Sequence, residues 1–279
     1  MISSLLKTLA TLRWGEWSLI TLFISVLSGM VVALQYDPAT PLYSSSALDI
    51  MVPYGSYFRS LHFYSSQFFF LLAIAHLLAV FKRSEGYTRT QWLKLSATLP
   101  VGLLILFTGY ILRGDSTGSS AGIIAENILL TIPVLGDTLN DLLLSISDNH
   151  MKRVYANHVI SLGVLWGALA WEHLRVYRTS FRDHLPLTGI VLLISVLIAA
   201  PFEPEQLGVF HISGPWFFLG LQELLRFLPP LVAGVFTPLL LLIALFLLRP
   251  ASRHQRPLLL FMLIWLLTYG VLSIIASGR

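Results

Sequence analysis

The sequence predicts an all-α, polytopic integral membrane protein with about seven transmembrane helices. Of its 279 residues, 56% are hydrophobic and 11% are charged, whereas soluble domains are about 45–50% apolar and about 25% charged. The mean hydropathy is +0.76. This composition excludes a soluble enzyme and a nucleic-acid-binding protein. Because the chain has no cysteine, any metal or cofactor depends on His, Met or carboxylate ligands, or on noncovalent packing.

Seven apolar segments are bounded by Pro, Gly or charged residues, as expected for helices that cross a hydrocarbon core about 30 Å thick. In chain order they are Trp17–Gln35, Leu61–Phe81, Leu93–Leu112, Tyr155–Tyr177, Leu185–Ala200, Leu231–Leu248 and Leu258–Ala276. Residues 1–16 combine spaced leucines with Lys7 and Arg13 and predict an interfacial amphipathic helix. We expect three parts: this helix, a four-helix core at 17–184 and a three-helix part at 185–279.

Positive charge is unequal on the two sides of the predicted membrane. With seven spans, 12 of the 18 Lys and Arg residues fall on the side of the N-terminus. These residues are Lys7, Arg13, Lys82, Arg83, Arg89, Lys94, Arg175, Arg178, Arg182, Arg249, Arg253 and Arg256. By the positive-inside rule, the N-terminus is cytoplasmic and the C-terminus lies on the outer, periplasmic side of a bacterial-type inner membrane.

Four histidines lie inside two of the predicted spans. His62 and His76 are 14 positions apart on the second segment, and His158 and His173 are 15 apart on the fourth. At about 100° per residue, His62 and His76 lie about 40° apart around their helix, and His158 and His173 lie about 60° apart around theirs. Each pair is about 21–22 Å apart along the helix axis. The two segments run parallel, so His62 can meet His158 near the outer surface and His76 can meet His173 near the inner one. Two bis-histidine sites at two depths favour two stacked b-type haems, with these imidazoles as the iron ligands.

Glycines and arginines near the histidines are consistent with haem binding. Gly15 and Gly29, also 14 apart, bracket the first segment, and Gly109 lies on the third. A residue without a Cβ atom lets a flat macrocycle approach the backbone closely. Arg59 and Arg153 precede the two outer histidines and are candidates for pairing with haem propionates.

Each of these residues also has an ordinary structural interpretation. Intramembrane histidines form hydrogen bonds between helices or relay protons, and interfacial arginines extend toward headgroups. A haem-free proton-coupled transporter therefore stays open as an alternative. A membrane anchor that binds haem without quinone turnover is a second alternative.

Several stretches resemble the cytochrome b family of bc-type quinol–cytochrome c oxidoreductases. The stretches that carry the resemblance are LSGMVVALQY (27–36), RSLHFYSSQFFFLLAIAH (59–76), FTGYILRGD (107–115), ENILLTIPVLGDTL (126–139), RVYANH (153–158) and GPWFFLGLQELLRFLP (214–229). Seven spans and the 15-residue spacing are more similar to the split, seven-span chloroplast and bacterial form than to the eight-span mitochondrial form. The resemblance covers nearly the whole chain.

The resemblance implies a membrane oxidoreductase subunit with two noncovalent b-type haems and bound quinone. Electrons would pass between the quinone pool and an outer-face redox partner, either a Rieske-type subunit or a c-type cytochrome, including a multihaem one. Lipid contact, a multi-subunit complex and a dimer are also implied. The direction of electron flow and the identity of the quinone stay open.

The outer quinol site departs from the family pattern. Where the family usually has Pro-Glu-Trp-Tyr, this chain has Gly214-Pro215-Trp216-Phe217, so the glutamate thought to accept a quinol proton is missing. Trp216 and Phe217 are retained as candidate quinone contacts. The candidate substitute proton acceptors are Asp115, Glu126, His211 and Glu223. At the inner quinone site, the candidates are Arg178, Arg182, Asp183 and His184. Where the family has a second glycine at the start of the third segment, this chain has Leu95.

Overall fold

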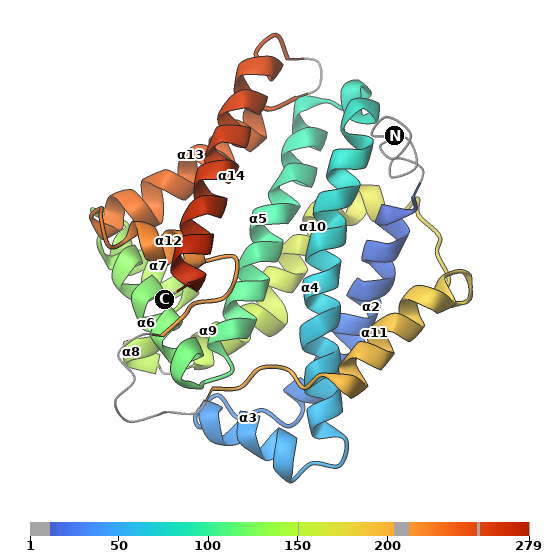
Figure 1. Cartoon of the computed structure of the whole chain (residues 1–279), viewed down its shortest axis with the longest axis vertical. Helices are drawn as coiled ribbons and strands as arrows, with labels where there is room; N and C mark the ends of the chain where they lie inside the picture. Colours follow the sequence, from blue (N-terminus) through green and yellow to red (C-terminus); the bar gives the residue numbers. More distant parts are fainter. Residues whose placement is uncertain (1–11, 150, 204–211, 250–251, 279) are drawn as a thin grey trace. The chain divides into compact units, whose positions relative to one another are not determined.

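The computed structural model describes residues 12–149, 151–203, 212–249 and 252–278, and all regular secondary structure in these ranges is helical (Figure 1). This confirms the predicted all-α class. The helices form two compact units, each built from separate stretches of the chain. The first unit comprises residues up to 36, 43–106 and 164–201; the second comprises 37–42, 107–163 and residues from 202 onward. Most of the helix predicted at 1–16 lies outside the described residues.

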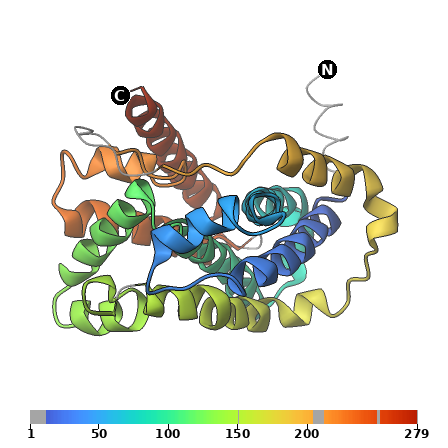
Figure 2. The ribbon, with the colours of Figure 1, turned by 90° about the horizontal axis from the view of Figure 1, so that it is seen from below.

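The first unit is centred on two long helices, α2 (Trp14–Ala33) and α4 (Gly55–Val80), which lie side by side. Figure 2 shows α4 end-on with α2 beside it. Small hydroxyl side chains on α2 are buried, namely Ser18, Thr21, Ser25 and Ser28. Thr21 and Ser28 donate their hydroxyls to carbonyls of their own helix, as Ser28 does to Ile24 at 2.7 Å. Small side chains that satisfy their own polar groups let two apolar helices approach closely.

Six further elements among the described residues contribute to the first unit. They are most of α3 (Pro41–Ile50), the 3₁₀ turn η1 (Phe81–Gly86), most of α5 (Arg89–Ile111) and of α10 (Leu162–Leu174), the 3₁₀ turn η3 (Phe181–His184) and α11 (Leu185–Leu197). α11 packs on α4. The buried His184 side chain holds its end of α11 to α2, with its Nε2 atom 3.0 Å from a carboxylate oxygen of Glu16.

The second unit contains the end of α5 and the helices that follow it. They are α6 (Ser116–Leu130), α7 (Gly136–Leu143), α8 (Ile146–Asn149), α9 (Lys152–Ala156), the π turn η2 (Asn157–Ser161), α12 (Leu219–Leu224), the π turn η4 (Leu231–Phe236), α13 (Thr237–Leu247) and α14 (Gln255–Ser277). α14 packs against α12 and α13. Asp115 begins α6 as its N-cap, accepting from the Gly118 N–H at 2.9 Å.

Five helical segments among the described residues are long and apolar enough to cross a membrane. They are Trp14–Ala33, Gly55–Gly86, Arg89–Ile111, Lys152–Leu174 and Gln255–Ser277. Segment Leu231–Leu247 is apolar but shorter. The 13 residues of α11 reach about 20 Å at 1.5 Å per residue, less than the hydrocarbon core. The total of seven spans stays a prediction.

Candidate functional site

Two of the predicted ligands meet inside the first unit. His76, on α4, and His173, on α10, have ring centroids 6.0 Å apart with the planes inclined at 50°. A metal–imidazole bond is about 2 Å long, so one metal ion between two facing imidazoles holds their ring centres roughly 6 Å apart. In this pair, the separation therefore fits a single ion with two axial imidazole ligands.

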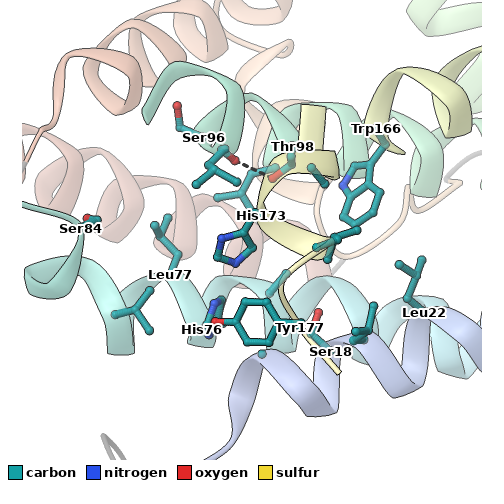
Figure 3. A pocket seen from close by; sticks show the side chains of 18 of the residues that line it. Ser18, Leu22, His76, Leu77, Ser84, Ser96, Thr98, Trp166, His173 and Tyr177 are labelled. Atoms are coloured by element: carbon teal, nitrogen blue, oxygen red, sulfur yellow. Dashed lines mark hydrogen bonds between the residues drawn. The ribbon is translucent and has the colours of Figure 1, made fainter. Parts of the chain in front are cut away.

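An apolar pocket surrounds these two rings (Figure 3). Its empty volume is about 940 Å³, a figure that includes space open to the surroundings. Apolar and aromatic side chains dominate the lining, among them Leu22, Leu77 and Trp166. No Asp, Glu, Lys or Arg is found among the lining residues in the described part of the chain. The pocket therefore suits a large, flat, apolar group with its metal held by His76 and His173.

The chemistry of the donor set also agrees with a haem. No group of three or more His, Cys, Asp or Glu side chains that could hold a bare metal ion occurs among the described residues. Two neutral imidazoles suffice for a haem iron, because the macrocycle supplies the other four ligands. The residues present therefore fit a b-type haem at the inner site.

Glycine backbones lie directly against three of the four histidine rings. A Cβ atom built on Gly15 would lie 2.8 Å from Cε1 of His76, and one on Gly29 would lie 2.7 Å from Cε1 of His62. A Cβ atom on Gly109 would lie 2.8 Å from Cε1 of His158. These distances are too short for real Cβ contacts, so only glycine leaves each ring in place.

The two outer histidines are also oriented by hydrogen bonds. In the first unit, the Nδ1 atom of His62 donates to the Ser25 carbonyl at 2.8 Å. A carbonyl only accepts, so the proton of this neutral ring lies on Nδ1 and the Nε2 lone pair is available to a metal. In the second unit, Nδ1 of His158 lies 3.0 Å from the Thr108 hydroxyl, which accepts from it when Nε2 is the ligand.

The π turn η2 explains the unequal histidine spacings. It spans Asn157–Ser161 and includes His158. A π turn holds one residue more than an α turn, so the 15-residue spacing to His173 gives nearly the rotation of 14 residues in an α-helix. The α4 pair is 14 residues apart in a helix without such a turn. The additional residue of η2 therefore accounts for the difference between the 14-residue and the 15-residue spacing.

The predicted arginines have different environments. Arg59 pairs with both carboxylate oxygens of Asp49, at 2.7 and 2.6 Å, and donates to the carbonyls of Ala200 and Pro201. It therefore clamps α3, α4 and the segment that follows α11 together. Arg153, Arg178 and Arg182 are exposed.

Asp115 occupies a fully buried position in the second unit. Its carboxylate accepts from Gly118 N–H, from the Thr117 hydroxyl at 3.1 Å and from the Glu203 N–H at 2.8 Å, and it pairs with Arg113. Each oxygen is thus engaged in holding the start of α6. This role is structural, whatever part Asp115 takes in proton transfer.

Glu126, another candidate proton acceptor, is buried in a polar network between α6, α7 and α8. It accepts from the Asn140 amide at 2.9 Å and from the Ser147 hydroxyl at 2.6 Å. Burial by itself raises the pKa of Glu126, but the hydrogen bonds from Ser147 and Asn140 outweigh it and the pKa is lowered. A carboxylate with a lowered pKa is a weak base, which disfavours Glu126 as the acceptor.

The remaining outer-site candidates lie on or near α12. Glu223 is buried, with an oxygen 3.9 Å from the Arg226 guanidinium. Trp216 is 48% exposed, and the Phe217 ring contacts both Trp216 and Phe218. His211 lies outside the described residues.

Sequence reasoning missed the groups that orient the outer rings. Ser25 lies one helical turn before Gly29, and Thr108 directly precedes Gly109. The Thr108 hydroxyl beside a ring-packing glycine is a signal in the sequence, but serine and threonine are common in membrane helices and the position does not stand out. The group that accepts from His62 is the backbone carbonyl of Ser25, which any residue type would supply.

Comparisons with known proteins place these residues in a family. A family model described as cytochrome b/b6/petB matches residues 3–181. Cytochrome b of Python regius is 25% identical over 287 aligned positions, covering 88% of this chain and 76% of that protein. A chain from a hyperthermophilic respiratory Complex III has a similar fold, with a TM-score of 0.69, 20% identity and coverage of 95% of this chain and 83% of that one. The family match contains all four histidines and the three glycines against their rings, and the chain belongs to the cytochrome b family of membrane electron-transfer proteins.

Proposed function

We propose that this chain is the di-haem cytochrome b subunit of a bc-type quinol oxidoreductase complex. The observation that carries the proposal is the facing pair His76 and His173, 6.0 Å apart inside an apolar pocket. A b-type haem bound there supplies reversible one-electron transfer. The protein holds it through two imidazoles, packs it against Gly15 and excludes water with the apolar lining.

We further propose that His62 and His158 hold a second, outer haem. What supports this is the environment of each ring within its own unit. Gly29 and Gly109 leave room for the rings, and Ser25 and Thr108 orient them. On α4, the two ligands are 14 residues apart, which corresponds to about 21 Å along the helix axis. Two haems at these levels would carry electrons across most of the hydrocarbon core.

Quinol oxidation at the outer face releases protons and requires a proton acceptor. Among the described candidates we assign this role to Glu223, because it is the nearest of them in sequence to Trp216 and Phe217, the candidate quinone contacts. Glu223 is buried on α12, which begins two residues after Phe217. At the inner face, Arg178 and Arg182 are exposed, where they can meet a quinone headgroup or haem propionates.

The partner and the orientation follow from the same proposal. The chain has no cysteine, so a Rieske cluster or a covalent c-type haem must come from another subunit of the complex, docked at the outer face. We place the N-terminus in the cytoplasm and the C-terminus outside, as the distribution of Lys and Arg predicts.

Paired removal of ligands tests the assignment. The double variant His62→Ala with His158→Ala is expected to lose the outer-haem absorbance and keep that of the inner haem. His76→Ala with His173→Ala is expected to do the reverse. Survival of both signals in either double variant would show that the pairing is wrong. A wild-type protein without Soret absorbance would favour the haem-free transporter, and two haems that quinol does not reduce would favour the anchor.

A further inference from the structure

The carbonyl of Phe217, a candidate quinone contact, lies just outside the hydrogen-bond ladder of α12. Residues 216–218 form a turn in which the Phe218 N–H donates to the Pro215 carbonyl at 2.7 Å. α12 begins at Leu219, and the Gln222 N–H donates to the Phe218 carbonyl at 2.9 Å. The Phe217 carbonyl comes one position earlier. It is on a half-buried residue, so it needs a partner from outside the helix.

Tyr269, on α14, supplies this partner. Its hydroxyl donates to the Phe217 carbonyl at 2.8 Å. The Tyr269 ring stacks on the Trp265 ring, with centroids 4.9 Å apart and planes inclined at 11°. The indole N–H of Trp265 in turn donates to the Thr237 carbonyl, at the start of α13, at 3.2 Å. The phenol is therefore held in a defined place by α13 and α14, and its hydroxyl proton is engaged by Phe217.

Gly220 brings the start of α12 against the same tyrosine. A Cβ atom built on Gly220 would lie 2.8 Å from the Tyr269 carbonyl oxygen, 2.9 Å from Cδ2 of Tyr269 and 2.9 Å from the Ser273 hydroxyl oxygen. The nearest of these atoms belongs to the backbone of α14, which cannot turn aside as a side chain can. A residue larger than glycine would thus move α12 away from α14.

Other side chains hold the earlier part of the segment. The Gln222 amide accepts from the Gly214 N–H at 2.8 Å and donates to the Ile212 carbonyl at 2.7 Å. The Tyr110 hydroxyl donates to the Ser213 carbonyl at 3.3 Å. These bonds fix residues 212–214, whereas the bond from Tyr269 fixes Phe217 and seats the turn that carries Trp216.

We propose that Tyr269 is a positioning residue of the outer quinol site, which holds Phe217 and the start of α12 so that Trp216 and Phe217 present one fixed surface to the quinol. This rests on the proposed function. Because its hydroxyl donates to the Phe217 carbonyl, Tyr269 acts through this segment and not on the quinol itself. A surface that holds the bound quinol and the transition state equally well affects KM, and its loss leaves kcat nearly unchanged.

Steady-state turnover of the purified complex tests this proposal, with a quinol analogue as donor and a soluble c-type cytochrome as acceptor. Tyr269→Phe removes only the hydroxyl. It is expected to raise the KM for quinol about fivefold, the usual effect of one lost hydrogen bond, with kcat within about twofold of wild type and the haem content unchanged. Ser277→Ala is the matched control, because its hydroxyl also donates to a carbonyl, that of Ile274 on its own helix, at 2.9 Å.

Gly220→Ala tests the same contact from the side of α12. It is expected to raise the KM as well, because it separates α12 from Tyr269. In the double variant with Tyr269→Phe, the increase should be smaller than the product of the two single increases, since both changes act on one contact. Gly270→Ala is the control on α14, because a Cβ atom there meets nothing within 4 Å.

The outcomes separate this proposal from the function on which it rests. An unchanged KM in Tyr269→Phe, loss of haem in that variant, multiplicative effects in the double variant, or equal effects in the controls would each overturn the positioning role. A fall in kcat with a displaced pH profile would also overturn it, because Tyr269 would then take part in proton transfer. All of these results leave the proposed function intact. A wild-type complex whose haems quinol does not reduce would overturn the proposed function itself.

Discussion

At the scale of single residues, the positions of three histidine rings depend on neighbouring glycines that have no side chain. Gly15 contributes to the inner site only by having no side chain, because a Cβ atom there would lie 2.8 Å from Cε1 and 2.9 Å from Nδ1 of His76. An imidazole without a metal can rotate away from such a clash. An imidazole that must keep a fixed bond to iron cannot.

Gly15→Ala is therefore expected to affect haem binding more than folding. We expect affinity for the inner haem to fall about tenfold or more, the usual size of effects on groups that orient metal ligands. Total haem would then approach half of the wild-type value, measured as pyridine haemochromogen per protein. Gly167→Ala is the control, because a Cβ atom at Gly167 meets nothing within 4 Å. Equal haem loss in the two variants would refute the role of Gly15.

Glu126 gives a prediction about pH. Its pKa is lowered in the folded protein by hydrogen bonds from Ser147 and Asn140, which outweigh the effect of burial. A lowered pKa means that Glu126 stabilises the fold at pH values above its unfolded pKa of about 4.3 and loses this effect as the pH falls through the folded value. Glu126→Gln should thus cost about 1–3 kcal/mol of unfolding free energy at pH 7 and much less near pH 3.

Thermal melting in detergent across this pH range checks the prediction. Asp141→Asn, an exposed carboxylate on α7, should have little effect at any pH. A cost for Glu126→Gln that is the same at pH 7 and pH 3 would mean that packing, not ionisation, accounts for it.

At the scale of elements, α2 and α4 depend on a face of small side chains. Thr21 on α2 is 0% exposed, and its hydroxyl donates to the Ser18 carbonyl at 2.9 Å. Thr21→Leu adds volume where the two helices meet. It should destabilise the protein by about 1–3 kcal/mol, the usual cost of overpacking, and lower its melting temperature. Val26→Leu, at a position 52% exposed on the same helix, serves as control, and an equal drop in that variant would argue against close packing.

The π turn η2 leads to a prediction about register. Deleting Ile160, which is exposed within the turn, should convert it to an α turn and keep both haems, because only the additional residue is lost. Deleting Leu71 from α4, which is 47% exposed, should turn His76 about 100° relative to His62 and remove at least one haem. Haem content of both deletion variants is the measurement. Loss of haem after the Ile160 deletion would contradict the account of η2.

At the scale of the whole molecule, the all-α class and the family were predictable from the sequence. Hydropathy predicted the membrane helices. The four histidines pointed to the family, since few other patterns place paired imidazoles at two depths of a membrane. The π turn was not predictable, because the 15-residue spacing of His158 and His173 does not by itself show that the helix contains an additional residue or where that residue lies. The clamp of Arg59 by Asp49 was missed for a different reason: a contact between residues on separate helices has no fixed spacing in the sequence.

The central claim is that this chain holds two b-type haems at two levels of the membrane. A redox-titrated visible spectrum of the purified protein tests it most directly. The account predicts two b-type components of equal amplitude, with separate midpoint potentials, both reduced by a quinol analogue. A single component, or no Soret absorbance after gentle purification, would contradict it.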